Sequence, residues 1–248
     1  TVAWYLCGRT RPTSFGNTLV AFILVGIPVF LIAKQPDLGT ALLIGASGLF
    51  VIFFGGLLWR YVMLAVFAGA AGLPVLWSFM HAYQKQRVMT FLDPESDPLG
   101  AGWNIIQSKI AIGSGGLTGK GWLQGTQSHL DFLPETHTDF IIAVLAEEFG
   151  FLGVLLLLFL YVLILIRGLI IAGKAQDPFS RMLAAGLTLT FFVYVVVNIG
   201  MVSGLLPVVG VPLPLVSYGG TSAVTLMLSI GMLMSIRAQR TSRRMRKV

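Results

Sequence analysis

Six long apolar runs dominate this sequence and leave it few ways to fold. Most of them are close to the ~20 residues that an α-helix needs to cross a bilayer. Lipid offers the backbone no hydrogen-bond partners, so each run is predicted to be a helix. The expected fold is therefore an all-α polytopic membrane protein, a transmembrane helix bundle with about six spans here: Thr18–Ala33, Leu38–Leu58, Tyr61–Met80, Phe140–Ile166, Met182–Leu206 and Thr221–Ile236.

Composition agrees with that fold and excludes an ordinary soluble domain. Hydrophobic residues make up 56% of the 248 residues and charged residues only 11%, against about 25% charged in soluble proteins. The net charge of +7 requires no nucleic acid, because a basic tail such as Arg240–Lys247 suits anionic lipid headgroups. Cys7 is the only cysteine, so no disulfide can form within the chain.

The placement of Lys and Arg predicts which way the bundle faces. With a cytoplasmic C-terminus, the inner segments hold twelve of the 17 basic residues, and the outer side holds the other five: Lys34, Lys85, Arg87, Lys109 and Lys120. This bias is the one that membrane proteins show. Residues 1–248 are expected to form a single transmembrane domain with one long extracytoplasmic loop, residues 82–138. Because residue 1 is Thr and no signal-like segment precedes it, the chain is expected to be the C-terminal part of a longer protein.

The long outer loop contains two segments with distinct predictions. Asn104–Ile112 is amphipathic and predicts a short helix at the membrane surface. Residues 113–121 hold five glycines, and such a backbone can approach a ligand closely and offer its amides to phosphate. A nucleotide-binding P-loop is excluded, because Ser114 and Gly121 stand where that motif needs Gly and Ser or Thr. A phosphate cradle and a flexible linker both stay open.

Three acidic residues at a membrane helix are the strongest candidates for function. Asp139, Glu147 and Glu148 lie at the start of the fourth apolar run, where ionisable groups are costly and usually functional. Thr136 and Asp139 have the spacing of a capping box, so a purely structural role for Asp139 is the simplest alternative. Helical periodicity places Asp139 and Glu147 on one stripe, about 12 Å apart along the axis, which a cap does not explain. Glu147 and Glu148 have a second interpretation as hydrogen-bonding groups within the bundle.

Other polar residues complete the set of candidates. Arg87, Lys109 and Lys120 are outer cations suited to a phosphate, although Arg87 has the alternative of reaching lipid headgroups. Asp37 follows a proline at the start of a span and is expected to cap it. Ser217 lies in a proline-broken outer segment that is expected to line a cavity. No spacing of His or Cys indicates a metal site.

Several segments resemble a known family. The resemblance covers nearly the whole chain and is to the SEDS family of peptidoglycan glycosyltransferases, in particular to its rod-shape branch rather than its division branch. It is carried by residues 35–40 (QPDLGT), 93–98 (DPESDP), 107–116 (QSKIAIGSGG), 119–121 (GKG), 125–127 (GTQ), 133–140 (LPETHTDF) and 212–220 (PLPLVSYGG). It implies a bundle of about ten transmembrane helices, of which this chain would lack the first few, and it places the catalytic aspartate at Asp139.

The resemblance implies an activity as well. The expected enzyme polymerises lipid II into glycan strands on the outer face of the bacterial cytoplasmic (inner) membrane, for cell elongation and rod shape. Asp139 would be the general base, with Arg87, Lys109, Lys120, Glu147 and Ser217 binding substrate. No cofactor is assigned, although a divalent cation, Mg²⁺ or Mn²⁺, stays open at the diphosphate. The implied partners are lipid II and undecaprenyl diphosphate-linked glycan, a class B penicillin-binding protein (a transpeptidase) and the elongation machinery.

Two other functions stay open at this point. A transporter that flips lipid II would also use buried carboxylates and proline-broken outer segments. A membrane scaffold would use the outer loop to dock a transpeptidase. The flippase interpretation needs ionisable groups that can be reached from both sides, yet no acidic residue lies in the inner half of any predicted span.

Overall fold

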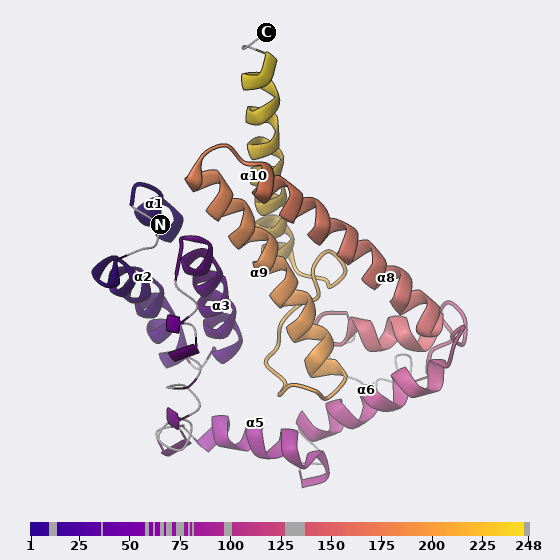
Figure 1. The fold of residues 1–248 in the computed structure, drawn as a ribbon. Helices are drawn as coiled ribbons and strands as arrows, with labels where there is room; N and C mark the ends of the chain where they lie inside the picture. The colour runs from indigo at the N-terminus through magenta and orange to yellow at the C-terminus, as the bar shows by residue number, and fades with distance from the viewer. Residues whose placement is uncertain are drawn as a thin grey trace. The chain divides into compact units, whose positions relative to one another are not determined.

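The computed structural model describes residues 1–9, 14–35, 37–57, 60–61, 63–64, 67, 71–72, 77–78, 80, 82–96, 101–126 and 137–245. Across these ranges the regular structure is helical and contains no strand, which confirms the all-α prediction. Figure 1 shows the helices in chain order: α1 Val2–Cys7, α2 Phe15–Lys34, α3 Leu38–Phe54, α5 Ala82–Leu92, the short 3₁₀-helix η1 Pro94–Ser96, α6 Ala101–Gly115, α8 Ile141–Lys174, α9 Pro178–Val202 and α10 Gly220–Met245.

Four of the described helices are long and apolar enough to cross a membrane. They are α2, α8, α9 and the part of α10 that ends at Gln239, and they confirm four of the six predicted spans. Helix α3 has only 17 residues, and the predicted span Tyr61–Met80 lies largely outside the described residues. Only 11% of the apolar window of α8 is buried within the chain, as expected of a helix whose side chains face lipid.

The chain divides into two compact units, and each is described here by itself. The first comprises residues Thr1–Gly72, Leu163–Val193 and Val224–Val248, and the second comprises Leu73–Val162 and Tyr194–Ala223. The single transmembrane domain expected from the sequence stays a prediction.

The first unit has two small apolar cores. One joins α1, α2, α3 and the start of α9 through Ala3, Leu6, Ala21, Val25, Ile52 and Met182; the other joins the end of α8 to α9 and α10 through Ala172, Ala175, Ala184, Ala185 and Ile236. Small residues let the helices approach closely, as is common in membranes. A Cβ at Gly48 would lie 2.5 Å from the side chain of Val25, and one at Gly168 would lie 2.3 Å from Thr188 Oγ1.

Capping residues set two helix starts in this unit. Asp37 accepts a hydrogen bond from the Thr40 amide at 3.0 Å, which confirms that Asp37 caps α3. Asp177 accepts one from the Ser180 amide at 2.8 Å and Pro178 occupies the first position of α9, where a missing N–H costs nothing.

The second unit contains α5, η1, α6, the first part of α8 and the segment that follows α9. The described part of the predicted outer loop is therefore mostly helical, and the helix expected at Asn104–Ile112 extends over Ala101–Gly115. Buried Ser108 joins α6 to the end of α9 by donating a hydrogen bond to the carbonyl of Val202 at 2.8 Å. Helix α9 ends before the predicted boundary at Leu206, because Gly204 adopts φ +70°, a left-handed conformation that terminates helices.

Helix α8 is broken near its start, which the prediction of one span over Phe140–Ile166 did not include. Gly150 has φ 65° and ψ −164°, values that no α-helix contains. Figure 1 shows the two segments of α8 meeting at an angle. We call Ile141–Phe149 the first segment of α8.

Candidate functional site

The turn His137–Phe140 carries Asp139 and immediately precedes α8. Helix α8 begins at Ile141 with no acidic residue in its first turn, so Asp139 lies before the helix. The capping box with Asp139 inside the first turn is therefore wrong, and so is a helical stripe that starts at Asp139 and continues to Glu147. Thr136, the other member of the predicted box, lies outside the described residues.

Three hydrogen bonds hold this turn by three consecutive backbone carbonyls. The Tyr218 amide donates to His137 O at 2.8 Å, the Ser217 hydroxyl donates to Thr138 O, and Asn198 Nδ2 donates to Asp139 O at 2.9 Å. All three donors belong to the end of α9 or to the segment between α9 and α10. Three consecutive carbonyls held in this way give the turn one orientation, so the Cα–Cβ direction of Asp139 is set by the fold.

The Asp139 side chain is half-buried and lies beside an exposed glycine. A Cβ added to Gly210 would come within 3.3 Å of Asp139 Oδ2, and Gly210 has φ +71°. Only glycine fits this position without backbone strain. The carboxylate is thus held at the surface of the loop and is not sealed in the core, as a group that meets a substrate requires.

Ser217 was predicted to bind substrate, and the structure gives it two backbone contacts. Its hydroxyl donates to Thr138 O and accepts from the Leu213 amide at 2.7 Å. The hydroxyl proton is already used, so Ser217 acts through the turn that carries Asp139. Tyr161 of α8 also supports this segment, by donating from its hydroxyl to Pro214 O at 2.7 Å.

Asn198 is a site residue that sequence reasoning missed. It is fully buried in α9 and Nδ2 also donates to Val211 O at 2.6 Å, so one amide group joins the turn of Asp139 to the loop. Its Oδ1 is buried without a hydrogen-bond partner among the described residues. The available signal was a single Asn within an apolar run, since polar groups at membrane depth are usually kept for a purpose.

The glycine-rich segment docks onto the break in α8. The amides of Lys120 and Gly121 donate to the carbonyls of Glu147 and Glu148, both at 3.0 Å; in return the amides of Phe151 and Leu152 donate to residues 116 and 117, at 2.9 and 3.1 Å. These bonds replace helical bonds that the chain loses at Gly150. The amides of Lys120 and Gly121 are occupied and so are not available to a phosphate, and the four bonds hold the segment in place, unlike a flexible linker.

Close packing explains why this segment needs glycine. A Cβ at Gly115 would lie 1.9 Å from Ala146 O, one at Gly119 would lie 2.0 Å from Glu148 O, and one at Gly150 would lie 2.3 Å from the Gly119 amide nitrogen. Backbone meets backbone at each of these positions, so no neighbouring side chain can rotate away to make room.

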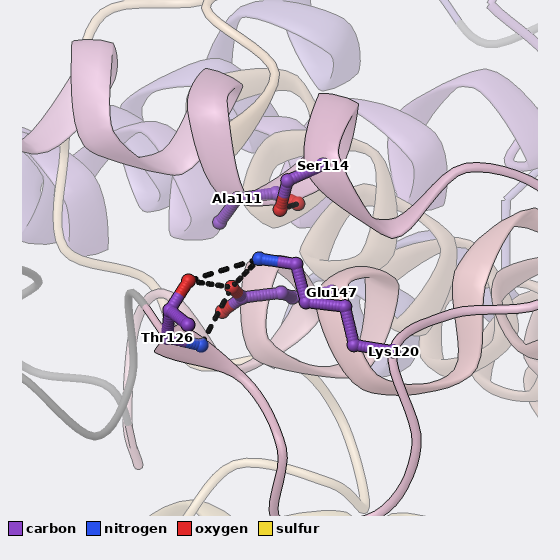
Figure 2. Close-up of polar contacts among 5 residues, drawn as sticks. All are labelled: Ala111, Ser114, Lys120, Thr126 and Glu147. Carbon is purple, nitrogen blue, oxygen red and sulfur yellow. Dashed lines mark hydrogen bonds and ion pairs between the residues drawn. The ribbon is translucent and has the colours of Figure 1, made fainter.

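Lys120 and Glu147, both predicted to bind substrate, form an ion pair with each other. Lys120 Nζ lies 2.7 Å from Glu147 Oε1, with the lysine side chain 29% exposed and the glutamate fully buried. Thr126 donates to the same oxygen from its amide at 2.8 Å and from its hydroxyl at 3.1 Å. Figure 2 shows the three side chains converging below Ala111 and Ser114 of α6. The hydrogen-bonding alternative for Glu147 is the one that this geometry supports.

The remaining candidates stand apart from these contacts. Lys109 is exposed on α6 with its Nζ beside Gly204, where a Cβ would lie 2.7 Å from that nitrogen. Arg87 lies on α5, and its side chain is outside what the structure describes. Glu148 is buried. In the described ranges, no group of three or more His, Cys, Asp or Glu is arranged to hold a metal ion.

A family model matches almost the whole chain. It is the model of FtsW, RodA and SpoVE, described as cell cycle proteins, and it covers residues 1–242.

Curated relatives agree with this match. The chain is 64% identical over 240 residues to the peptidoglycan glycosyltransferase MrdB of Escherichia coli K12, covering 96% of this chain and 65% of the relative. It is 46% identical over 177 residues to the peptidoglycan glycosyltransferase RodA of Treponema pallidum, covering 71% of this chain and 40% of the relative. The chain therefore spans less than two thirds of the length of these relatives.

Two solved structures share the fold. One is from a study of the structural coordination of polymerization and crosslinking by a peptidoglycan synthase complex, with a TM-score of 0.81 and 33% identity over 96% of this chain and 66% of that chain. The other is the rod shape determining protein RodA of Thermus thermophilus, with a TM-score of 0.64 and 30% identity over 96% of this chain and 62% of that chain.

Proposed function

We propose that the full-length protein is a peptidoglycan glycosyltransferase that polymerises lipid II. The reason is that this chain belongs to the family of FtsW, RodA and SpoVE, which is the SEDS family. MrdB, its relative at 64% identity, carries that name. The proposal concerns the full-length protein, since the chain spans only part of its relatives.

The observation that carries the proposal is how the fold holds Asp139. Three hydrogen bonds fix its backbone and its half-buried carboxylate lies beside exposed Gly210. An enzyme needs its base held in one orientation and still within reach of substrate. A carboxylate that only capped a helix would need neither property.

The proposed reaction uses Asp139 as general base. The 4-hydroxyl oxygen of the acceptor sugar attacks the anomeric carbon of the growing chain while the carboxylate takes its proton. The bond from that carbon to the lipid diphosphate breaks, and undecaprenyl diphosphate leaves with the electron pair. Glycosidases need a second carboxylate to protonate an alkoxide leaving group, whereas a diphosphate leaves once its charge is stabilised. The α-linked donor becomes a β-1,4 bond, with inversion.

Lys109 is the cation best suited to stabilise the diphosphate. It is exposed on α6, and its Nζ lies beside Gly204. Gly204 belongs to the segment between α9 and α10, which also holds the Asp139 turn. Lys120 is already paired with buried Glu147, so we assign Lys120 and Glu147 to holding the segment after α6 and not to binding substrate. Arg87 stays a prediction.

A divalent cation at the diphosphate also stays open. The described residues do not form a cluster that fits an ion, and no step of the proposed reaction passes through a metal.

The chain is a multi-pass membrane protein, as its apolar helices and its family indicate. We place it in the bacterial cytoplasmic membrane with its C-terminus inside and Asp139 outside, on the basis of the Lys and Arg distribution. As a partner we propose a crosslinking transpeptidase of the penicillin-binding class. The solved complex that couples polymerization with crosslinking supports it.

The test is glycan synthesis by purified full-length protein in detergent, with labelled lipid II as the only substrate. The wild type should make long glycan strands, and Asp139→Asn should make them at least about a hundredfold more slowly. Asp177→Asn is the matched control, because it makes the same chemical change at a helix cap that Asn also serves well.

Detergent also separates polymerase from flippase, since flipping across a membrane yields no product there. Absence of glycan from well-folded wild type would contradict the polymerase assignment. Normal glycan synthesis by Asp139→Asn would contradict only the assignment of Asp139 as general base, and would leave the polymerase assignment standing.

A further inference from the structure

A cavity at the end of α8 is lined by three basic side chains. Its volume is about 150 Å³, and its lining includes Arg167 and Lys174 of α8 and Arg237 of α10. All three side chains are exposed, and the described residues that line the cavity include no acidic residue. None of the three forms an ion pair or a side-chain hydrogen bond with another described residue. Three like charges around one cavity repel one another until an anion enters.

The floor of this cavity is apolar. Arg167, Ile170, Ile171 and Lys174 follow the i, i+3, i+4, i+7 spacing of one helix face, so the two cations of α8 flank two isoleucines. Ile236 of α10 closes the floor and belongs to the apolar core at the end of α8. The cavity therefore combines basic side chains with an apolar floor.

Its position matches the boundary between lipid tails and headgroups. Lys174 is the last residue of the 34-residue helix α8, and α9 begins at Pro178, so the chain turns back at once. Arg167 lies seven residues earlier, about 10 Å along the helix axis. The side chains at positions 163, 166 and 170 are 43%, 47% and 39% exposed, which leaves an apolar track leading from the cations along α8.

We propose that this cavity binds an anionic phospholipid of the phosphatidylglycerol class. The phosphodiester would accept hydrogen bonds from Arg167, Lys174 and Arg237, and an acyl chain would lie along the exposed isoleucines of α8. Cations near a membrane surface favour anionic lipid. Phosphatidylethanolamine fits less well because its ammonium group would add a fourth positive charge. A free phosphate would leave the apolar floor uncovered.

The test measures phosphatidylglycerol retained by delipidated full-length protein, by native mass spectrometry and in phosphatidylcholine nanodiscs doped with the lipid. Arg167→Gln/Arg237→Gln should bind about 30-fold more weakly, at about fivefold per cation. Arg243→Gln/Arg244→Gln removes the same charge from the basic C-terminal tail, neither residue being among the described residues that line the cavity, and should bind nearly as wild type. Ile170→Trp keeps every charge but fills the floor, and should also weaken binding.

Three results would overturn the site. Equal losses in the two double variants would mean that diffuse charge attracts lipid. Equal retention of phosphatidylethanolamine would remove the role of the cations, and displacement of the lipid by millimolar inorganic phosphate would assign the cavity to a soluble anion. A melting temperature near wild type is expected for Arg167→Gln/Arg237→Gln, since both substituted side chains are exposed.

Discussion

Replacing Gly119 with alanine tests whether the glycine segment is a structural part of α8. The new Cβ would lie 2.0 Å from Glu148 O, and the backbone has φ +79°. To restore ordinary contact, the segment must withdraw by about 1 Å or more, which breaks the bonds from the Lys120 and Gly121 amides, both 3.0 Å long. Two lost hydrogen bonds and left-handed strain together cost about 3 to 5 kcal/mol.

Two neighbouring glycines supply matched controls. Gly116 has φ +56° with open space around its missing Cβ, so Gly116→Ala should cost only the strain, about 1 to 2 kcal/mol. Gly113 lies inside α6 with open space, so Gly113→Ala should stabilise the helix by about 0.5 to 1 kcal/mol. The same chemical change thus has three different expected results within seven residues.

The assay is thermal unfolding of the full-length protein in detergent, combined with amide hydrogen exchange. Gly119→Ala should melt lowest and should speed exchange in peptides covering the two sides of Gly150, because both sides share the same bonds. The segment would be a linker after all if Gly119→Ala melted together with Gly113→Ala and left that exchange unchanged.

Two further predictions concern the residues around the site. Lys120→Met leaves the fully buried Glu147 carboxylate without its cation and should cost about 3 kcal/mol; adding Glu147→Gln should recover part of that loss, and strictly additive losses in thermal unfolding would mean that the pair is not coupled. Ser217→Ala removes the contacts to Thr138 and Leu213; it should lower kcat for glycan synthesis while KM for lipid II changes little, whereas a rise in KM alone would restore Ser217 as a substrate ligand.

Hydropathy predicted the long helices well, because α2, α8, α9 and α10 owe their existence to length and apolar content. The sequence also predicted the helix in the outer loop and the cap at Asp37. It did not predict the break in α8. Gly150 follows Glu147 and Glu148 within an otherwise apolar run, and its positive φ depends on the segment that docks beside it.

The site was predicted in part. Asp139 was found through its cost at a membrane helix, but its mounting was not, because Asn198, Ser217 and Tyr218 lie far along the chain. Lys120 and Glu147 are 27 residues apart, so no local sequence spacing predicts that they pair. Contacts of this kind are products of tertiary packing, and a single sequence indicates only that each polar group needs a partner.

The most direct test of the account is the single-turnover rate of β-1,4 bond formation by the full-length protein, because single turnover isolates chemistry from product release. Asp139→Asn keeps the shape of the side chain but cannot take a proton, so the rate should fall by about 10² to 10⁴ while Asp177→Asn stays near wild type. A folded Asp139→Asn protein that forms the bond at the wild-type rate would contradict the claim that this carboxylate is the base.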